Sequence, residues 1–501
     1  MTNVKEKINE FKDYLKEIEY LQSTIGILSW DSMVCMPKKG IEYRSQILGY
    51  LSAEFYKIST SEKIKEYIDF FDNIDNLDIV TKAMLRNVKK NYERTKKIPK
   101  DEYRDFTIAV SNSKAAWEEA KGKNDFSIFA PHLKTIVEYK RKFIDYLGYE
   151  DNKYDTLLDE YEPSITTKKL DQVFSQLRDA IVDLLREIEH TGYAPNTEFF
   201  KGEFPKENQR EFSEIILEKM GYDFKEKGRI DESMHPFTIN FGNKDVRITT
   251  NYSKEDFTSA LFSCIHEGGH GIYEQNIDDN LEGTLLAAGA SMGIHESQSR
   301  FYENLIGKSM EFWRYFYKEA KNRFKAFEEV DFIEFYNGIN LVEPSLIRTE
   351  ADELTYSLHI IIRYEIEKQL INGEIEVDDL PGIWREKYIK YLGIEPKNDA
   401  EGVLQDMHWS DGSFGYFPSY ALGNLYGAQF LSKMKKDIPN LYEQISSGDL
   451  FVINKWLKEN IHKFGSIYEP EDIIKRVTGE ELDAKYFIEY LQEKFKKIYN
   501  L

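Results

Sequence analysis

The chain has 501 residues, of which 41% are hydrophobic and 14% aromatic, far too much apolar material for a disordered protein. Its 88 acidic residues outnumber its 67 basic ones and give a formal charge of -21, so nucleic acid is excluded as an expected partner, because an acidic protein repels phosphate backbones. The sequence contains no run of 18 apolar residues, so we expect no membrane span and no membrane partner.

The cysteine content and the N-terminus indicate a reducing compartment. Cys35 and Cys264 are the only cysteines and lie far apart, so they cannot provide the disulfide framework of a secreted protein. The first 20 residues are rich in Lys and Glu at helical spacing and lack the apolar segment of a secretory signal. We therefore expect a cytoplasmic protein.

Apolar residues recur at a period near 3.6 through most of the chain, which predicts a mainly α-helical fold. Two examples are the sets Ile8, Phe11, Leu15, Ile18 and Leu21, and Leu170, Val173, Phe174, Leu177, Ile181 and Leu184. Short breaks separate the helices, and no long linker or fixed-period repeat is present. We expect a single unit over residues 1–501, with approximate lobes at 1–230 and 231–501.

One region reads as strands rather than helices. Residues 237–241 and 246–250 alternate apolar and polar side chains around the turn-like segment 242–245, which predicts a β-hairpin. An edge strand there could pair with an extended peptide. The alternative is a small sheet that only braces the neighbouring helix, and the sequence leaves both roles open.

A metal-binding motif follows the hairpin. Residues 266–270 read His-Glu-Gly-Gly-His inside a predicted helix. His266 and His270 are four residues apart and share one helix face, so both imidazoles can reach a single zinc ion at about 2.0–2.1 Å. Glu267 lies beside that face, where it can act as the general base on a metal-bound water.

Chance is a poor explanation for this motif. A chain of this composition gives roughly 0.016 matches by chance, and two satisfied core histidines are the ordinary alternative. Gly268 and Gly269 strengthen the metal interpretation, because each glycine costs a helix interior about 1 kcal/mol relative to alanine and needs a local reason. We expect another backbone, or the substrate, to approach the helix closely here.

A catalytic zinc needs a third protein ligand and one open position for water. The segment 291–303 offers His295, Glu296 and Glu303. Spacing alone does not separate Glu296 from Glu303, since seven residues return to nearly the same helix face. Ordinary surface charge is the alternative explanation for either carboxylate.

Six motifs in order carry a resemblance to a known family. They are His-Pro-Phe at 235–237, Asp-Val-Arg-Ile-Thr at 245–249, the pentad at 266–270, His-Glu-Ser-Gln at 295–298, Ile-Arg-Thr-Glu-Ala-Asp at 347–352, and Gly-Val-Leu-Gln-Asp-Met-His-Trp at 402–409. Together with Trp30-Asp31, Met36-Pro37 and Gly40, this set resembles the M32 metallocarboxypeptidases, the Taq-type thermostable carboxypeptidase family. The likeness covers most of the chain.

The resemblance implies a large, nearly all-helical zinc-peptidase fold with a deep groove, and a homodimer. It implies stepwise removal of single C-terminal residues from peptides, with broad specificity and a dislike of C-terminal proline. It also assigns Glu296 as the third metal ligand, and it suggests that Arg348 and Tyr420 contact the substrate or the tetrahedral intermediate.

One position departs from the wider group of zinc enzymes with this motif. Arg300 stands four residues after Glu296, where many relatives place an acidic residue that orients a metal histidine. A ligating imidazole usually donates its second N–H to such a partner. Asp352 and Asp406 are the candidates for that role, and membership of a buried ion pair is the alternative for each.

Further side chains complete the expected site. His408 is a candidate hydrogen-bond donor to the developing oxyanion, with Tyr420 as a second candidate, and a packed histidine beside an aromatic is the alternative. Arg348 would hold the substrate's terminal carboxylate as a bidentate pair. Arg247, on the polar side of the hairpin, is the competing candidate.

The expected mechanism is attack on the last peptide carbonyl by a water whose pKa zinc lowers, with Glu267 taking the proton and passing it to the leaving amine. One divalent metal per chain is expected, with Co²⁺ and Mn²⁺ as alternatives to Zn²⁺. The rival functions are an oligopeptidase or endopeptidase with the same chemistry, and a helical scaffold with a structural metal site.

Overall fold

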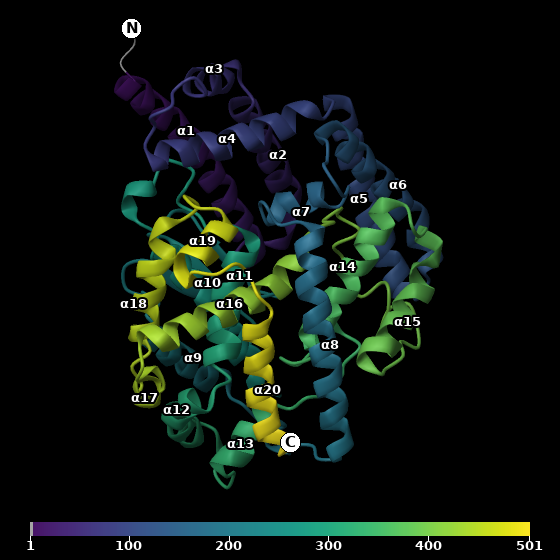
Figure 1. The fold of residues 1–501 in the computed structure, drawn as a ribbon, viewed down its shortest axis with the longest axis vertical. Coiled ribbons are helices and arrows are strands. Elements are labelled where there is room, and N and C mark those ends of the chain that lie inside the picture. The colour runs from purple at the N-terminus through teal and green to yellow at the C-terminus, as the bar shows by residue number, and fades with distance from the viewer. Residues whose placement is uncertain (1–3) are drawn as a thin grey trace. The chain divides into compact units, whose positions relative to one another are not determined.

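The computed structural model describes residues 4–501, which are mainly helical in both of the compact units into which the chain divides (Figure 1). Unit 1 comprises Met1–Lys96, Asn196–Ile339 and Phe430–Gly479, and unit 2 comprises Lys97–Pro195, Asn340–Gln429 and Glu480–Leu501. Both units contain residues from before and after position 230, so neither unit corresponds to one of the approximate lobes 1–230 and 231–501. The prediction of one peptidase unit over residues 1–501 stays a prediction.

Unit 1 holds the sheet and most of the helices. Its α-helices are α1 (Val4–Val34), α2 (Ile41–Ser59), α3 (Glu62–Phe71), α9 (Lys206–Met220), α10 (Phe257–Gln275), α11 (Met292–Arg300), α12 (Met310–Arg323), α13 (Phe332–Ile339), α17 (Leu441–Ser446), α18 (Phe451–Asn460) and α19 (Pro470–Thr478). The short segments are the 3-10 turns η1 (Lys38–Gly40), η2 (Glu198–Phe200), η3 (Asp279–Leu281), η5 (Lys325–Phe327) and η8 (His462–Phe464), and the π-helical segment η4 (Phe301–Ile306).

Unit 2 is built from helices and 3-10 turns. They are α5 (Lys100–Lys123), α6 (Phe126–Leu147), α7 (Asp155–Tyr161), α8 (Thr167–Thr191), η6 (Arg348–Glu350), α14 (Tyr356–Asn372), η7 (Val377–Asp379), α15 (Leu380–Leu392) and α20 (Lys485–Tyr499). Two helices contain a unit boundary, α4 (Ile79–Lys97) and α16 (Pro418–Asp437).

The predicted amphipathic helices are confirmed. All six periodic residues of α8, from Leu170 to Leu184, are buried, as are Phe11, Leu15 and Ile18 of α1. No helix among residues 4–501 has the length and apolar character that crossing a bilayer requires.

The predicted β-hairpin is also confirmed, and it is part of a three-stranded sheet. Strands β2 (Thr238–Asn240) and β3 (Val246–Thr250) pair antiparallel across a turn in which Gly242 has a φ of +112°. Strand β1 (Gly228–Glu232), which pairs parallel with β3 on its other side, was not predicted from the sequence. This strand has only one large apolar residue, Ile230, so it lacks the alternation that reveals a half-buried strand.

Helix α10 is the central element of unit 1. It begins at Phe257, where the Asp256 carboxylate caps it by accepting hydrogen bonds from the backbone N–H groups of Thr258 and Ser259 at 2.8 and 3.2 Å. The helix packs against α9, α11, η4 and strand β3. The metal-binding motif is therefore held from several sides by secondary structure.

Candidate metal centre

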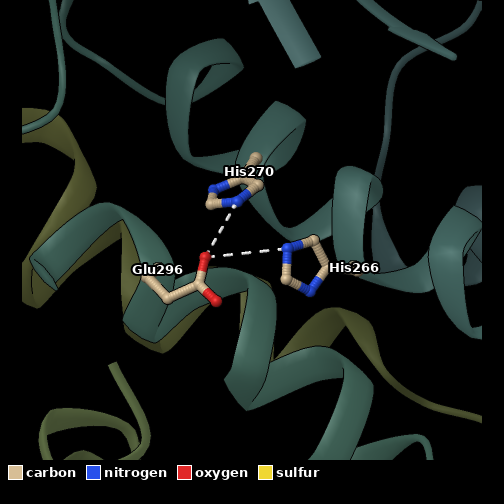
Figure 2. A group of neighbouring side chains, drawn as sticks. All are labelled: His266, His270 and Glu296. Carbon is tan, nitrogen blue, oxygen red and sulfur yellow. Dashed lines mark ion pairs between the residues drawn. The ribbon is translucent and has the colours of Figure 1, made fainter. Parts of the chain in front are cut away.

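Three side chains from α10 and α11 converge in unit 1. His266 and His270 lie one turn apart on α10, and Glu296 reaches toward both from α11. The Nε2 atoms of His266 and His270 lie 3.6 and 3.4 Å from Oε2 of Glu296. Figure 2 shows one oxygen of the Glu296 carboxylate facing both imidazoles. Among residues 4–501, this is the only group of three or more His, Cys, Asp or Glu side chains close enough together to hold one ion.

The two glycines of the motif let neighbouring helices come this close. A Cβ on Gly269 would lie 2.5 Å from the backbone oxygen of Gln298 and 2.8 Å from Cα of Ser299, both on α11. A Cβ on Gly268 would lie 2.1 Å from the Leu217 side chain on α9. The expected close approach of another backbone is thus confirmed at Gly269, and it brings the helix of Glu296 against the helix of the histidines.

The donor set fits a divalent metal. Zinc bonds of about 2.0–2.1 Å in a tetrahedral site place the ligand atoms about 3.3–3.4 Å apart, close to the 3.4 and 3.6 Å separations at Glu296. Arg300 donates to the other carboxylate oxygen of Glu296, Oε1, at 2.8 Å, so Oε2 faces the two Nε2 atoms. Three protein ligands leave a fourth position for water or substrate, as in catalytic zinc sites.

Glu303 partners His266 on the side away from Glu296. Its Oε2 lies 2.7 Å from His266 Nδ1, and Arg300 Nη1 donates to the same oxygen at 3.1 Å. Glu303 lies in η4, where the Gly307 N–H donates to the Tyr302 carbonyl five residues back at 2.7 Å. Glu296 is therefore the carboxylate near both Nε2 atoms, and Glu303 orients one ring.

The prediction that Asp352 or Asp406 orients a metal histidine is wrong. Asp352 instead accepts hydrogen bonds from the backbone N–H groups of Leu354 and Thr355 at 2.8 and 3.0 Å, just before α14. Asp406 is held by arginines, as the alternative reading expected. Glu303, in η4, takes this role for His266, since its Oε2 lies 2.7 Å from His266 Nδ1.

His270 is backed by a different kind of partner. Its Nδ1 lies 2.5 Å from Nδ1 of His295, whose Nε2 lies 2.7 Å from Oε1 of Glu274. His295 was one of the three candidates for the third ligand. Its Nδ1 meets the rear of His270, so it is a neighbour of a ligand rather than a ligand of the same ion.

The electrostatics of the two histidines differ accordingly. Burial lowers the pKa of His266, but the carboxylates of Glu296 and Glu303 outweigh it and raise that pKa to about 8. Burial, together with the neighbouring His295, lowers the pKa of His270 to about 3. Burial acts to raise the pKa of Glu303, and Arg300 and His266 overcome it and lower that pKa to about 2. The carboxylate of Glu303 is therefore ionised at neutral pH.

Glu267 is buried beside the metal ligands. Burial raises the pKa of its carboxyl group above the ordinary value. The hydroxyl of Thr238, on strand β2, lies 2.7 Å from Oε2 of Glu267 and 2.9 Å from its backbone oxygen. The sheet thus fixes the direction of one oxygen of Glu267. One role of the hairpin is therefore to position this side chain.

A second cluster, in unit 2, gathers the other predicted residues around Asp406. Arg348 donates to Oδ1 of Asp406 from Nη2 at 2.8 Å, and Arg363 donates to Oδ2 from Nε at 2.6 Å. Burial lowers the pKa of Arg348, yet Asp406 outweighs it and holds that pKa above the ordinary value. Arg348 is 7% exposed, and its Nη1 lies 3.3 Å from the Tyr356 hydroxyl.

His408 and Tyr420 belong to this second cluster. The guanidinium of Arg348 lies 5.1 Å from the ring centre of Tyr420, and the rings of His408 and Phe417 are 4.5 Å apart. Burial lowers the pKa of His408 to about 4, although Asp406 opposes the shift. His408 is therefore neutral at neutral pH and keeps one N–H to donate.

Arg247 lies in unit 1, on β3. Its Nε and Nη2 each donate to Asp245 at 2.8 Å as a bidentate pair. Its guanidinium stacks 4.3 Å from the ring centre of Trp30 and 4.9 Å from that of Phe241. The two candidate arginines thus share one property, since each already has a carboxylate partner.

The sequence did not predict three residues of these clusters, Thr238, Glu274 and Arg363. Glu274 carried a usable signal, because it stands four residues after His270 on the same helix and hence on the same face. Thr238 and Arg363 carried none, because their roles depend on chain segments that are distant in sequence.

Comparisons with known proteins agree with this geometry. The family described as "Carboxypeptidase Taq (M32) metallopeptidase" matches residues 10–495. Carboxypeptidase 1 of Bacillus subtilis is 48% identical over 494 residues, which cover 98% of each chain. Thermostable carboxypeptidase 1 of Pyrococcus furiosus is 38% identical over 471 residues, which cover 94% of each chain.

Solved structures show the same fold. The M32 carboxypeptidase of Deinococcus radiodurans matches with a TM-score of 0.96 at 33% identity, covering 99% of this chain and 100% of that one. A Pyrococcus furiosus carboxypeptidase matches with a TM-score of 0.96 at 37% identity, covering 99% of each. The fold class and the peptidase function expected from the sequence are confirmed, and the scaffold reading is excluded. The chain belongs to the M32 family of metallocarboxypeptidases.

Proposed function

We propose that this carboxypeptidase holds a zinc ion with His266, His270 and Glu296 and removes single residues from peptide C-termini with broad specificity. The observation that carries the proposal is the pair of Nε2 atoms at 3.6 and 3.4 Å from one oxygen of Glu296, beside the buried Glu267. Co²⁺ and Mn²⁺ suit the same donors. Metal analysis of purified protein identifies the ion.

A divalent metal in this site supplies Lewis-acid chemistry, lowering the pKa of a water and polarising the peptide carbonyl. Glu267 takes a proton from the attacking water as the new C–O bond forms, and it gives that proton to the leaving amine as the C–N bond breaks. Its raised pKa suits both steps, because the group must accept a proton and then release it. Thr238 supports this role by donating to Oε2.

Two side chains of the second cluster are proposed to act on the oxyanion. Neutral His408 has an N–H to donate, and the Tyr420 hydroxyl is the other candidate. Arg348 is proposed to bind the terminal carboxylate. Two guanidinium groups around Asp406 leave one surplus positive charge, which favours an anionic ligand there. Arg247 is the competing candidate.

The order of cleavage tests the proposal. A peptide of about ten residues is incubated with the metal-loaded enzyme, and its products are followed by mass spectrometry. We expect a ladder that loses one C-terminal residue at a time. Losses of two residues per step indicate an oligopeptidase releasing dipeptides, and internal fragments indicate an endopeptidase. Either result would contradict the proposed cleavage position.

We also propose that the enzyme is a homodimer, as the family resemblance implies. Helix α2 has no buried residue, and its Tyr43 and Tyr50 are 70% and 66% exposed; Tyr20 of α1 is 67% exposed. Light scattering tests the assembly, and Tyr43→Glu with Tyr50→Glu tests this face. A wild-type monomer contradicts the dimer. The cytoplasmic location expected from the sequence stays a prediction.

A further inference from the structure

A second imidazole and a buried carboxylate stand behind His270. His270 Nδ1 faces His295 Nδ1 at 2.5 Å, and His295 Nε2 faces Glu274 Oε1 at 2.7 Å. Glu274 is 4% exposed. It also accepts from the side-chain amide of Asn240 and from the backbone N–H of Gly289. The carboxylate is thus fixed by donors from the sheet and from the loop before α11.

The directions of the hydrogen bonds that link His270, His295 and Glu274 follow from the final acceptor, Glu274. Glu274 accepts from Gly289 at Oε1 and from Asn240 at Oε2, so Nε2 of His295 is the donor toward Oε1. With the proton on Nε2, Nδ1 of His295 is the acceptor, and His270 donates to it from its own Nδ1. The lone pair of His270 is left on Nε2, which lies 3.4 Å from Oε2 of Glu296. This is the tautomer that a metal requires.

Packing keeps the intermediate ring in place. A Cβ on Gly289 would lie 2.4 Å from Cδ2 of His295, so the loop closes directly against the imidazole. The ring of Tyr273 lies 5.2 Å away on the other helix. His295 therefore has little freedom to rotate away from His270.

We propose that His295 is a positioning residue that, through Glu274, fixes the tautomer and the ring orientation of His270 for metal binding. The inference rests on the proposed role of His270 as a metal ligand. Partners of this kind orient ligands and raise their basicity, and their loss typically costs 10–100-fold in metal affinity. The usual partner is a carboxylate, a backbone carbonyl or water, whereas here an imidazole passes the interaction on.

Zinc retention tests the proposal independently of activity. Zinc-loaded wild type, His295→Leu, His295→Asn and His270→Ala are titrated with a chromophoric chelator to obtain zinc affinities. His295→Leu removes the acceptor at similar size, and we expect about 10–100-fold weaker binding. In His295→Asn, the amide oxygen can take the place of Nδ1, so we expect an affinity within about threefold of wild type. Thermal unfolding of the metal-free proteins checks the fold.

The outcomes distinguish the proposed hydrogen-bond relay, from Glu274 through His295 to His270, from the metal site itself. If His270→Ala loses zinc and His295→Leu binds as wild type, the relay is overturned while the metal site stands. Equal losses in His295→Leu and His295→Asn also overturn it, because they show a need for the ring itself rather than for an acceptor. Full zinc binding by His270→Ala instead overturns the proposed ligand set. His295→Ala replaces the leucine variant if that variant does not fold.

Discussion

The two buried charged clusters carry opposite surpluses of charge. Around the metal ligands, the carboxylates of Glu267, Glu296 and Glu303 face a single guanidinium, Arg300, which bonds two of them. The cluster in unit 2 reverses the count, with two guanidinium groups on the single carboxylate of Asp406. His270 and His408, whose pKa values burial lowers, are neutral at neutral pH and change neither balance. His266, with a pKa of about 8, adds one positive charge beside the three carboxylates, so the metal side keeps a surplus of one negative charge.

The opposite surpluses of charge suit the two clusters to different kinds of ligand. Buried charge is costly unless it is paired, so an unbalanced cluster gains from a ligand of the opposite sign. The negative surplus suits a divalent cation, and the positive surplus suits a carboxylate such as the end of a peptide. Substitutions in either cluster test this difference in charge, and the expected effects range from loss of the general base to the pH dependence of metal binding.

The largest effect is expected from Glu267→Gln. The change keeps the shape of the side chain and removes the proton acceptor, so kcat should fall by about 10²–10⁴. Zinc content should stay near wild type, because the three ligands remain. Single-turnover kinetics and metal analysis of one preparation check both points. A variant that retains more than about a tenth of kcat would show that another group is the base.

Glu303→Gln tests the role of the charged partner of His266 beside the metal site. The amide cannot match the charged partner of His266 Nδ1, so metal affinity should fall about 10–100-fold. Asp406→Asn is the matched control, since it removes a buried carboxylate of the arginine cluster. Chelator titration should leave its zinc affinity unchanged. If only Asp406→Asn loses zinc, then Asp406 rather than Glu303 orients the metal histidine.

The arginine side is tested by removing the negative charge of the substrate. Amidating the C-terminus should cost wild-type enzyme about 2 kcal/mol in kcat/KM, or about 30-fold, for a lost charge-assisted pair. Arg348→Gln should lose a similar factor on the free acid and little more on the amide. Equal penalties on both substrates would move the assignment to Arg247, whose Arg247→Gln variant is then compared in the same way.

The smallest effect, taken over a single pH unit, is the pH dependence of metal binding. His266 has a pKa of about 8 without metal, so below pH 8 it must release a proton to bind the ion. Affinity should therefore rise about tenfold per pH unit from pH 6 to 8 and level off above. His270, with a pKa of about 3, is already neutral over this range. A slope of zero below pH 8 would contradict the raised pKa of His266.

The sequence predicted those parts of the molecule that depend on local spacing. The helix of the HEGGH pentad, the hairpin and the metal histidines follow from periods of 3.6 and 2. It could not separate Glu296 from Glu303, because an ideal helix places both on one face, and the π-helical segment η4 does not show in side-chain spacing. The Arg363–Asp406 pair joins residues 43 positions apart, which no period reveals.

The backbone contact at Gly269 lies between the helix that carries the two metal histidines and the helix that carries Glu296. Because α10 and α11 approach main chain to main chain there, this contact constrains the spacing between the two histidines and Glu296. A substitution elsewhere in the core can alter the free energy of unfolding and leave this backbone contact unchanged. A single carbon added at position 269 pushes directly against α11. That position is therefore where a protein engineer would begin in order to widen the metal site for a larger cation.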